Sequence, residues 1–183
     1  MIRKLEKNDR EQILRILTDT KHFNDDEIKV AMELIDIYLN DANQKDYIIY
    51  VSADDDAKKE VNSLSFPAKS GHGGEAGLPA AGSGRVSGYI CYGLRPLTDW
   101  TYDLYWIAVD PDIHGKGLGS GLVKHMEEDL KARSGRIALI ETSGKAEYEN
   151  ERKFYSKNGY EVQTIIKDFY RSGDDLFVYR KYL

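Results

Sequence analysis

The sequence has little cysteine and histidine, with one Cys and four His among 183 residues. The single thiol, Cys91, excludes an internal disulfide and suits a reducing compartment. The histidines have no ligand-like spacing with one another or with the cysteine, so we expect no metal site. They are His22, His72, His114 and His125.

Long apolar runs and an excess of positive charge are also missing. No run approaches the ~20 apolar residues that cross a membrane, and residues 1–5 lack the apolar segment of a signal peptide. The net charge of -5 and the pI near 5.4 argue against binding nucleic acid by bulk electrostatics. We therefore expect a cytoplasmic protein with neither nucleic acid nor membrane as partner.

The remaining composition, 41% hydrophobic and 31% charged, is typical of one globular domain, and we expect a single domain over 1–183. One segment departs from it. Residues 54–85 combine an acidic run with prolines and glycines and offer almost nothing to bury. We interpret 54–85 as a flexible insertion between two strands, either disordered or a functional flap, and not as a second domain.

Apolar periodicity and turn residues predict seven strands and four helices in a mixed α/β order. Helices are expected from a capping box at Asn8 and Glu11, from an N-cap at Asn24, after the glycines near 117, and over 148–157. The last of these ends at Asn158-Gly159, a left-handed C-cap. The predicted strands cover 2–5, 47–51, 86–93, 102–109, 136–143, 160–169 and 176–182.

The chain is organised around residues 102–133. A strand rich in aromatic and β-branched residues leads through a turn at Asp110-Pro111-Asp112-Ile113 into the glycine-rich run 114–121, and an amphipathic helix follows. Glycines allow the backbone to turn tightly, and the unpaired N–H groups of the first helical turn then point at whatever lies before it. The pattern predicts a site for a phosphate-bearing ligand, the alternative being a plain glycine turn.

The spacing of the glycines excludes two familiar phosphate loops. A dinucleotide fingerprint fails because Ser120 or Leu122 stands where its third glycine belongs, and a P-loop fails because Gly117 follows Gly115-Lys116. The run His114-Gly115-Lys116-Gly117-Leu118-Gly119 instead resembles the acyl-CoA loop of the GNAT superfamily of N-acyltransferases, (Gln/Arg)-x-x-Gly-x-(Gly/Ala). His114 stands where that family usually has Gln or Arg.

A second stretch is similar to the same family. Phe154-Tyr155-Ser156-Lys157-Asn158-Gly159-Tyr160 resembles its Phe-Tyr-x-x-x-Gly-(Phe/Tyr) signature, although Phe154 and Tyr155 are also compatible with plain core packing. Residues 167–175, together with Glu141-Thr142-Ser143 and Arg152, resemble a group of small GNAT proteins. The resemblance covers 101–183, whereas the first hundred residues agree only in the order of elements.

The resemblance implies a GNAT-like α/β (α+β) fold: a mixed, mostly antiparallel central sheet of six to seven strands flanked by about four helices. It also implies acetyl-CoA, or another acyl-CoA, as co-substrate and no metal. Many members have Asn seven residues before the tyrosine, where this chain has Tyr148, and Asn150 comes two residues late. The cofactor-binding residues that it implies are Ile107, Ala108, Val109, His114, Gly115, Lys116, Gly117, Leu118, Gly119, Ser120, Asn150, Phe154 and Tyr155.

Acyl transfer to an amine needs an acid and a base, because an ammonium has no lone pair with which to attack. The resemblance implies that Tyr155 protonates the leaving thiolate. It also implies a base eleven residues before the loop, which is Asp103, or else Glu141 on the next strand. Strand alternation places Asp103 on one face with Tyr105, Ile107 and Val109, where desolvation would raise its pKa. The alternative for Asp103 is an exposed carboxylate at the entrance of the strand.

Together these features predict an acyl-CoA-dependent N-acyltransferase, in particular an N-acetyltransferase. It would pass an acetyl group from acetyl-CoA directly to the primary amine of a small molecule or peptide, as a monomer or homodimer. Two alternatives stay open. One is a non-catalytic, CoA-binding or regulatory protein with a GNAT fold, and the other is an acetyltransferase for protein lysines or N-termini.

Overall fold

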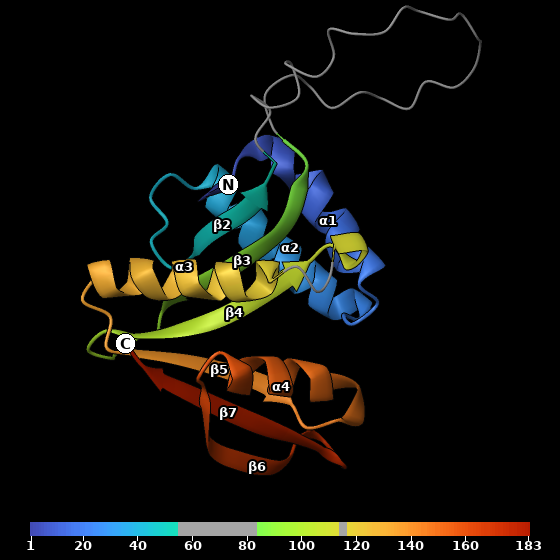
Figure 1. Cartoon of the computed structure of the whole chain (residues 1–183), viewed down its shortest axis with the longest axis vertical. Helices are drawn as coiled ribbons and strands as arrows, with labels where there is room; N and C mark the ends of the chain where they lie inside the picture. Colours follow the sequence, from blue (N-terminus) through green and yellow to red (C-terminus); the bar gives the residue numbers. More distant parts are fainter. Residues whose placement is uncertain (55–83, 114–116) are drawn as a thin grey trace, which may run out of the picture.

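The computed structural model describes residues 1–54, 84–113 and 117–183, and its centre is a seven-stranded sheet in the order β1-β2-β3-β4-β5-β7-β6 (Figure 1). All neighbouring strands are antiparallel except β4 and β5, which are parallel. The strands are β1 Ile2–Lys4, β2 Ile48–Ala53, β3 Val86–Leu94, β4 Thr101–Val109, β5 Ile137–Ser143, β6 Glu161–Arg171 and β7 Asp174–Tyr182.

Four α-helices cover the two faces of this sheet: α1 Arg10–Asp19, α2 Asp25–Asn40, α3 Leu118–Ala132 and α4 Glu149–Lys157. Short 3-10 turns precede three of them, at Lys7–Asp9, Pro111–Ile113 and Ala146–Tyr148. In Figure 1, α3 crosses in front of β2 to β4 and α4 lies in front of β5 and β7, while α1 and α2 lie behind. The predicted fold class is confirmed. Within the described ranges, no helix combines the length and apolarity that a membrane span requires.

The helix starts show where local sequence was sufficient. At α2 the capping box is present, because Asn24 accepts from the Glu27 N–H while Glu27 accepts from the Asn24 N–H. The predicted box at Asn8 and Glu11 is wrong: Asp9, fully buried, accepts from the Glu6 N–H and from Arg3 at 2.6 Å. Arg3 on β1 therefore pairs with Asp9, and this tertiary contact determines where the first helical segment begins.

A β-bulge in β4 changes the faces that its side chains occupy. Cys91 pairs with Trp106 and Tyr92 pairs with Leu104, so Tyr105 is the extra residue on β4. Tyr105 and Trp106 consequently both pack into the core beneath α1 and α2, instead of alternating.

The bulge overturns part of the predicted alternation. Leu104, Ile107 and Val109 pack into the core on the α3 side, and Ala108 packs on the opposite side. Asp103 keeps Tyr105 as a neighbour on its own face, and its charge contributes to the raised pKa of that tyrosine. The prediction that Asp103 shares a face with Ile107 and Val109 is wrong, because one inserted residue inverts the alternation beyond it.

The ends of the predicted insertion lie side by side. Ala53 pairs with Val86, and the Asp54 N–H donates to the Arg85 carbonyl at 3.0 Å. The segment 55–83 between them lies outside the described residues. Since adjacent antiparallel strands need only a short turn, the body of the fold makes no geometric demand for a long connection here.

We therefore expect residues 55–84 to be dispensable for folding. Replacing them with a short Gly-Ser turn, with Arg85 retained, should lower the melting temperature by less than about 8 °C. Thermal denaturation followed by circular dichroism measures this change. A larger fall would show that the replaced segment packs on the body of the protein.

Candidate functional site

The parallel strands β4 and β5 separate partway along their length, and a cavity opens between them. Their pairing runs from Thr101 opposite Ile137 to Leu104 opposite Ile140, although β4 continues to Val109 and β5 to Ser143. The cavity measures about 1070 Å³ and is lined by the far halves of both strands, the start of α3, α4, and the loop between α1 and α2. This volume is at the upper end of the range found for small-molecule and cofactor pockets.

The first turn of α3 forms one end of the cavity. Gly117 is its N-cap with φ of 78°, a left-handed conformation that favours glycine, and the Gly121 N–H donates to the Gly117 carbonyl at 2.9 Å. The N–H groups of residues 118–120 have no acceptor within the helix and lie where an anion would be favoured. Of the predicted loop, His114, Gly115 and Lys116 lie outside the described residues.

Glycine at 119 lets α3 approach α4. A Cβ added to Gly119 would lie 3.2 Å from the Phe154 ring, tighter than a normal contact. The two predicted motifs therefore meet in space. Every described residue of the predicted cofactor-binding set lines the cavity: Ile107, Ala108, Val109, Gly117, Leu118, Gly119, Ser120, Asn150, Phe154 and Tyr155.

Asp110 fixes the turn that leads from β4 towards the loop. Its carboxylate is fully buried and accepts from Arg15 at 2.6 Å, from Arg85 at 2.9 Å, and from the Asp112 N–H at 3.1 Å. Burial raises the pKa of Asp110, but the hydrogen bonds from Arg85 and Arg15 outweigh burial and hold that pKa below its ordinary value. Asp110 and Asp112 thus both belong to the turn, as their position in the sequence suggests.

Asp110 should make stability depend on pH in a defined direction. Because its pKa is lower in the folded state, its stabilisation is complete above the unfolded value of about 3.9 and is lost as the pH falls through the folded value. Asp110→Asn should lower the free energy of unfolding by about 1–3 kcal/mol at pH 7 and by clearly less near pH 3. Urea titrations measure both differences. Asp112→Asn, at a carboxylate that is 76% exposed, is the control.

Tyr155 lies on α4 with its ring in an aromatic cluster and also lines the cavity. Its neighbours are Phe154, Tyr160 and Tyr179, at centroid distances of 5.4, 6.5 and 5.9 Å. Burial, followed by the charge of Glu151, raises the pKa of Tyr155 well above its ordinary value. The hydroxyl is therefore protonated at neutral pH and can only donate a proton there. Tyr155 therefore packs in the core and also lines the cavity, and its catalytic role stays a prediction.

The two predicted bases lie beside each other and share one arginine. Arg95 contacts Asp103 at 3.1 Å and Glu141 at 3.2 Å. Glu141 lines the cavity, and Asp103 is not among the lining residues. Burial raises the pKa of Asp103, Arg95 lowers it, and Glu141 raises it again, with a net upward shift.

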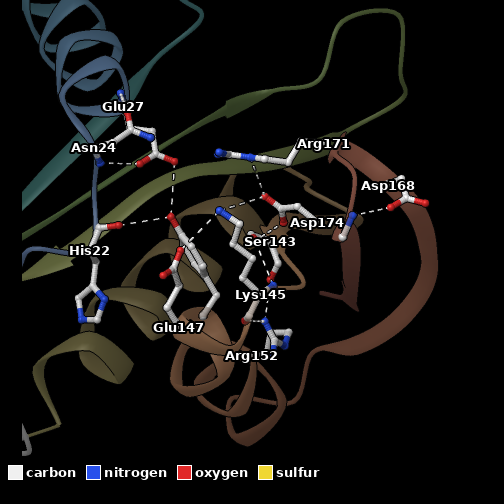
Figure 2. A network of polar contacts seen from close by, with 12 residues as sticks. His22, Asn24, Glu27, Ser143, Lys145, Glu147, Arg152, Asp168, Arg171 and Asp174 are labelled. Carbon is white, nitrogen blue, oxygen red and sulfur yellow. Dashed lines mark hydrogen bonds and ion pairs between the residues drawn. The ribbon is translucent and has the colours of Figure 1, made fainter.

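A polar network connects the end of β5 to α4 and β7 (Figure 2). Arg152 donates to the carbonyls of Ser143 and Lys145 at 2.7 and 2.8 Å, and the Ser143 hydroxyl donates to Asp174. Arg171 contacts the same aspartate at 3.7 Å. Ser143, Arg171 and Asp174 line the cavity, whereas Arg152 contacts the network from outside the cavity lining. Ser143, Arg152, Arg171 and Asp174 all belong to the scattered motif noted in the sequence.

The loop between α1 and α2 closes the opposite side, and sequence reasoning missed its contribution. The Tyr148 hydroxyl lies 3.3 Å from the His22 carbonyl and 3.5 Å from the Glu27 carboxylate. His22 also lies 3.5 Å from Glu151 on α4 (Nδ1 to Oε1). No local pattern signals these contacts, because they join segments separated by more than a hundred residues. Glu151 stands four residues before Tyr155 in the expected helix, and this spacing is the local feature that could have placed it near the site.

No metal centre accompanies this cavity in the parts of the chain that the structure describes. Over residues 1–54, 84–113 and 117–183, no three His, Cys, Asp or Glu side chains are grouped so that they could hold a metal ion. Cys91 is buried, and burial raises the pKa of its thiol far above the ordinary value. It lies outside the cavity lining.

Comparisons with known proteins agree with this geometry. Residues 78–162 match a family model described as an acetyltransferase (GNAT) domain. The crystal structure of a putative acetyltransferase of the GNAT family from Desulfovibrio desulfuricans shares 31% sequence identity and a TM-score of 0.81, covering 100% of this chain and 98% of that one. A comparison with curated protein sequences gave no match.

Two more distant structures share the fold. An aminoglycoside 6'-N-acetyltransferase complexed with coenzyme A has 15% identity and a TM-score of 0.65, covering 100% of this chain and 96% of that one. The ribosomal-protein-S18-alanine N-acetyltransferase from Escherichia coli has 15% identity and a TM-score of 0.64, with coverage of 100% and 92%. The split sheet, the glycine-capped helix and these matches define an acetyltransferase fold. The chain belongs to the GNAT acetyltransferase family.

Proposed function

We propose that this protein is an N-acetyltransferase that moves the acetyl group of acetyl-CoA directly to a primary amine. The observation that carries the proposal is that described residues of both sequence motifs, Tyr155 among them, line one cavity together with Glu141, where β4 and β5 separate. Coenzyme A in the aminoglycoside 6'-N-acetyltransferase structure supports the choice of co-substrate. The aminoglycoside and ribosomal-protein enzymes support an amine as acceptor.

The cofactor would lie along three elements. Backbone N–H groups at the start of α3 would hold the pyrophosphate, which favours a helix N-terminus. The edge of β4 from Ile107 would hydrogen-bond the pantetheine arm, since pairing with β5 ends at Leu104. The thioester would then lie near Tyr155. Asn150 lines this path, and a role for it in binding pantetheine stays a prediction.

Two proton transfers accompany the reaction. The ammonium substrate must first lose a proton to expose the nitrogen lone pair, and the departing thiolate must gain one. We assign the first step to Glu141, because it reaches the cavity. Asp103, beside Arg95, stays the second candidate. We assign the second step to Tyr155, whose raised pKa keeps it protonated until the sulfur leaves.

A thiol-release assay tests the proposal. Acetyl-CoA is incubated with polyamines, amino acids, aminoglycosides and lysine peptides, and free thiol is measured together with the acetylated amine by mass spectrometry. We expect thiol and acetylated amine in equal amounts with at least one class. Acetyl-CoA binding without thiol release across the panel would favour the non-catalytic alternative, and release with peptides alone would favour a protein acetyltransferase.

Gly117 provides a test of the cofactor site. Gly117→Ala places a side chain at φ of 78°, which costs about 1–2 kcal/mol for an ordinary residue. Relieving this strain would turn the N–H groups at the start of α3 away from their present direction, so the affinity for acetyl-CoA should fall about 5- to 30-fold. Isothermal titration calorimetry measures this change. Gly121→Ala, at a helical position with open space around the added Cβ, should leave the affinity unchanged.

A further inference from the structure

An unpartnered carboxylate oxygen in the wall of the cavity has no role so far. Four buried side-chain atoms lack a hydrogen-bond partner among the residues that the structure describes: Tyr89 Oη, His125 Nε2, Glu151 Oε2 and Tyr160 Oη. Of these four residues, only Glu151 lines the cavity. A buried acceptor without a donor costs free energy, so its retention in a cavity wall calls for a ligand or a proton that uses it.

Glu151 lies in the cavity wall between the α1–α2 loop and Tyr155. Its Oε1 lies 3.5 Å from His22 Nδ1, so the α1–α2 loop holds one side of the carboxylate. The helix places it four residues before Tyr155, and positions i and i+4 lie on the same face. Burial, followed by the charge of Glu151, raises the pKa of Tyr155.

We propose that Glu151 is a catalytic residue that forms a proton relay with Tyr155. This inference rests on the proposed function and assigns a proton that Glu141 does not handle. When the neutral amine attacks the thioester carbon, the new C–N bond leaves one surplus proton on nitrogen. Glu151 takes that proton, and the C–S bond breaks with its electron pair on sulfur. Tyr155 protonates the sulfur, and Glu151 returns its proton to the tyrosinate.

This sequence balances without any further reactant. The first proton of the ammonium leaves through Glu141 to solvent, and the second passes from nitrogen to sulfur within the cavity. Both Glu151 and Tyr155 end in the state in which they began. The relay also meets the difficulty that burial creates for Tyr155: a buried tyrosinate is strongly disfavoured, and a protonated Glu151 one helical turn away would return the proton to it.

Glu151→Gln tests the relay, since it keeps the size and a hydrogen-bonding oxygen but cannot take the proton. We expect kcat to fall about 10²-fold, with the acetyl-CoA affinity, the amine KM and the melting temperature close to wild type. Glu149→Gln on the same helix is the matched control, because Glu149 lies outside the cavity lining, is 59% exposed and pairs with Lys153. Glu151→Asp retains the carboxylate and should recover part of the lost rate.

A double variant separates a relay from independent roles. If the two residues act in one chain, Glu151→Gln with Tyr155→Phe should be no slower than the slower single variant. Multiplying losses, an unchanged kcat in Glu151→Gln, or a loss confined to acetyl-CoA affinity would each overturn the assignment of Glu151. A wild-type protein that binds acetyl-CoA but releases no thiol would instead overturn the proposed function, and this inference with it.

Discussion

Replacing Tyr155 with phenylalanine should lower kcat by about 10²-fold while leaving the fold and the acetyl-CoA affinity nearly unchanged. The substitution removes only the hydroxyl and keeps the ring among Phe154, Tyr160 and Tyr179. General acids contribute roughly 10²–10⁴-fold. A thiolate is already a fair leaving group, so the low end of that range applies.

Three measurements together decide the role of Tyr155. Steady-state kinetics gives kcat, calorimetric titration gives the acetyl-CoA affinity, and thermal denaturation reports the packing of α4. Tyr160→Phe is a suitable control, because the Tyr160 hydroxyl is buried outside the cavity lining. A Tyr155→Phe variant with wild-type turnover would leave Tyr155 as a core residue only. An affinity loss equal to the loss in turnover would make the hydroxyl a cofactor ligand.

Replacing Glu141 with glutamine should lower the rate of acetyl transfer by about 10²-fold at neutral pH and by less as the pH rises. At neutral pH a primary amine with a pKa near 10.4 is almost entirely protonated, so a base is needed to release its lone pair. At higher pH free amine accumulates and the missing base matters less. The deficit should therefore shrink steadily between pH 7 and pH 10.

The pH–rate profile of Asp103→Asn distinguishes the two candidate bases. Arg95 contacts both carboxylates, so each variant leaves it with one partner and disturbs the pair to a similar extent. We expect Asp103→Asn to run parallel to wild type. The reverse outcome, with a pH-dependent deficit in Asp103→Asn and none in Glu141→Gln, would assign the base to Asp103.

If Glu141 and Glu151 both act as proposed, the two proton transfers take place on residues of different elements that line the cavity. Glu141 stands on β5 beside Arg95, whereas Glu151 stands on α4 beside His22. The acceptor amine would lie between them, bounded by the α1–α2 loop and by Tyr170 of β6, which also lines the cavity. Differences in these two segments are therefore where we expect acceptor preference to be decided.

Local sequence was sufficient for the elements and for the glycine-capped start of α3. Apolar periodicity located the seven strands and four helices to within a few residues. Conformational requirements are also local: Gly117 and Gly159 both adopt the left-handed backbone that their positions in the pattern demanded. A motif made of consecutive residues can be read because its geometry is set by the backbone that joins them.

Tertiary structure alone decided which side chains from distant segments meet around the cavity. The bulge at Tyr105 inverted the alternation of β4, and it can be seen only in the pairing with β3. The contacts of Arg95 with Glu141, and of His22 with Glu151, join residues that are distant in sequence. Such contacts depend on the order of the strands in the sheet and on the point where β4 and β5 separate. The hydrophobic periodicity of a single segment contains no information about either feature.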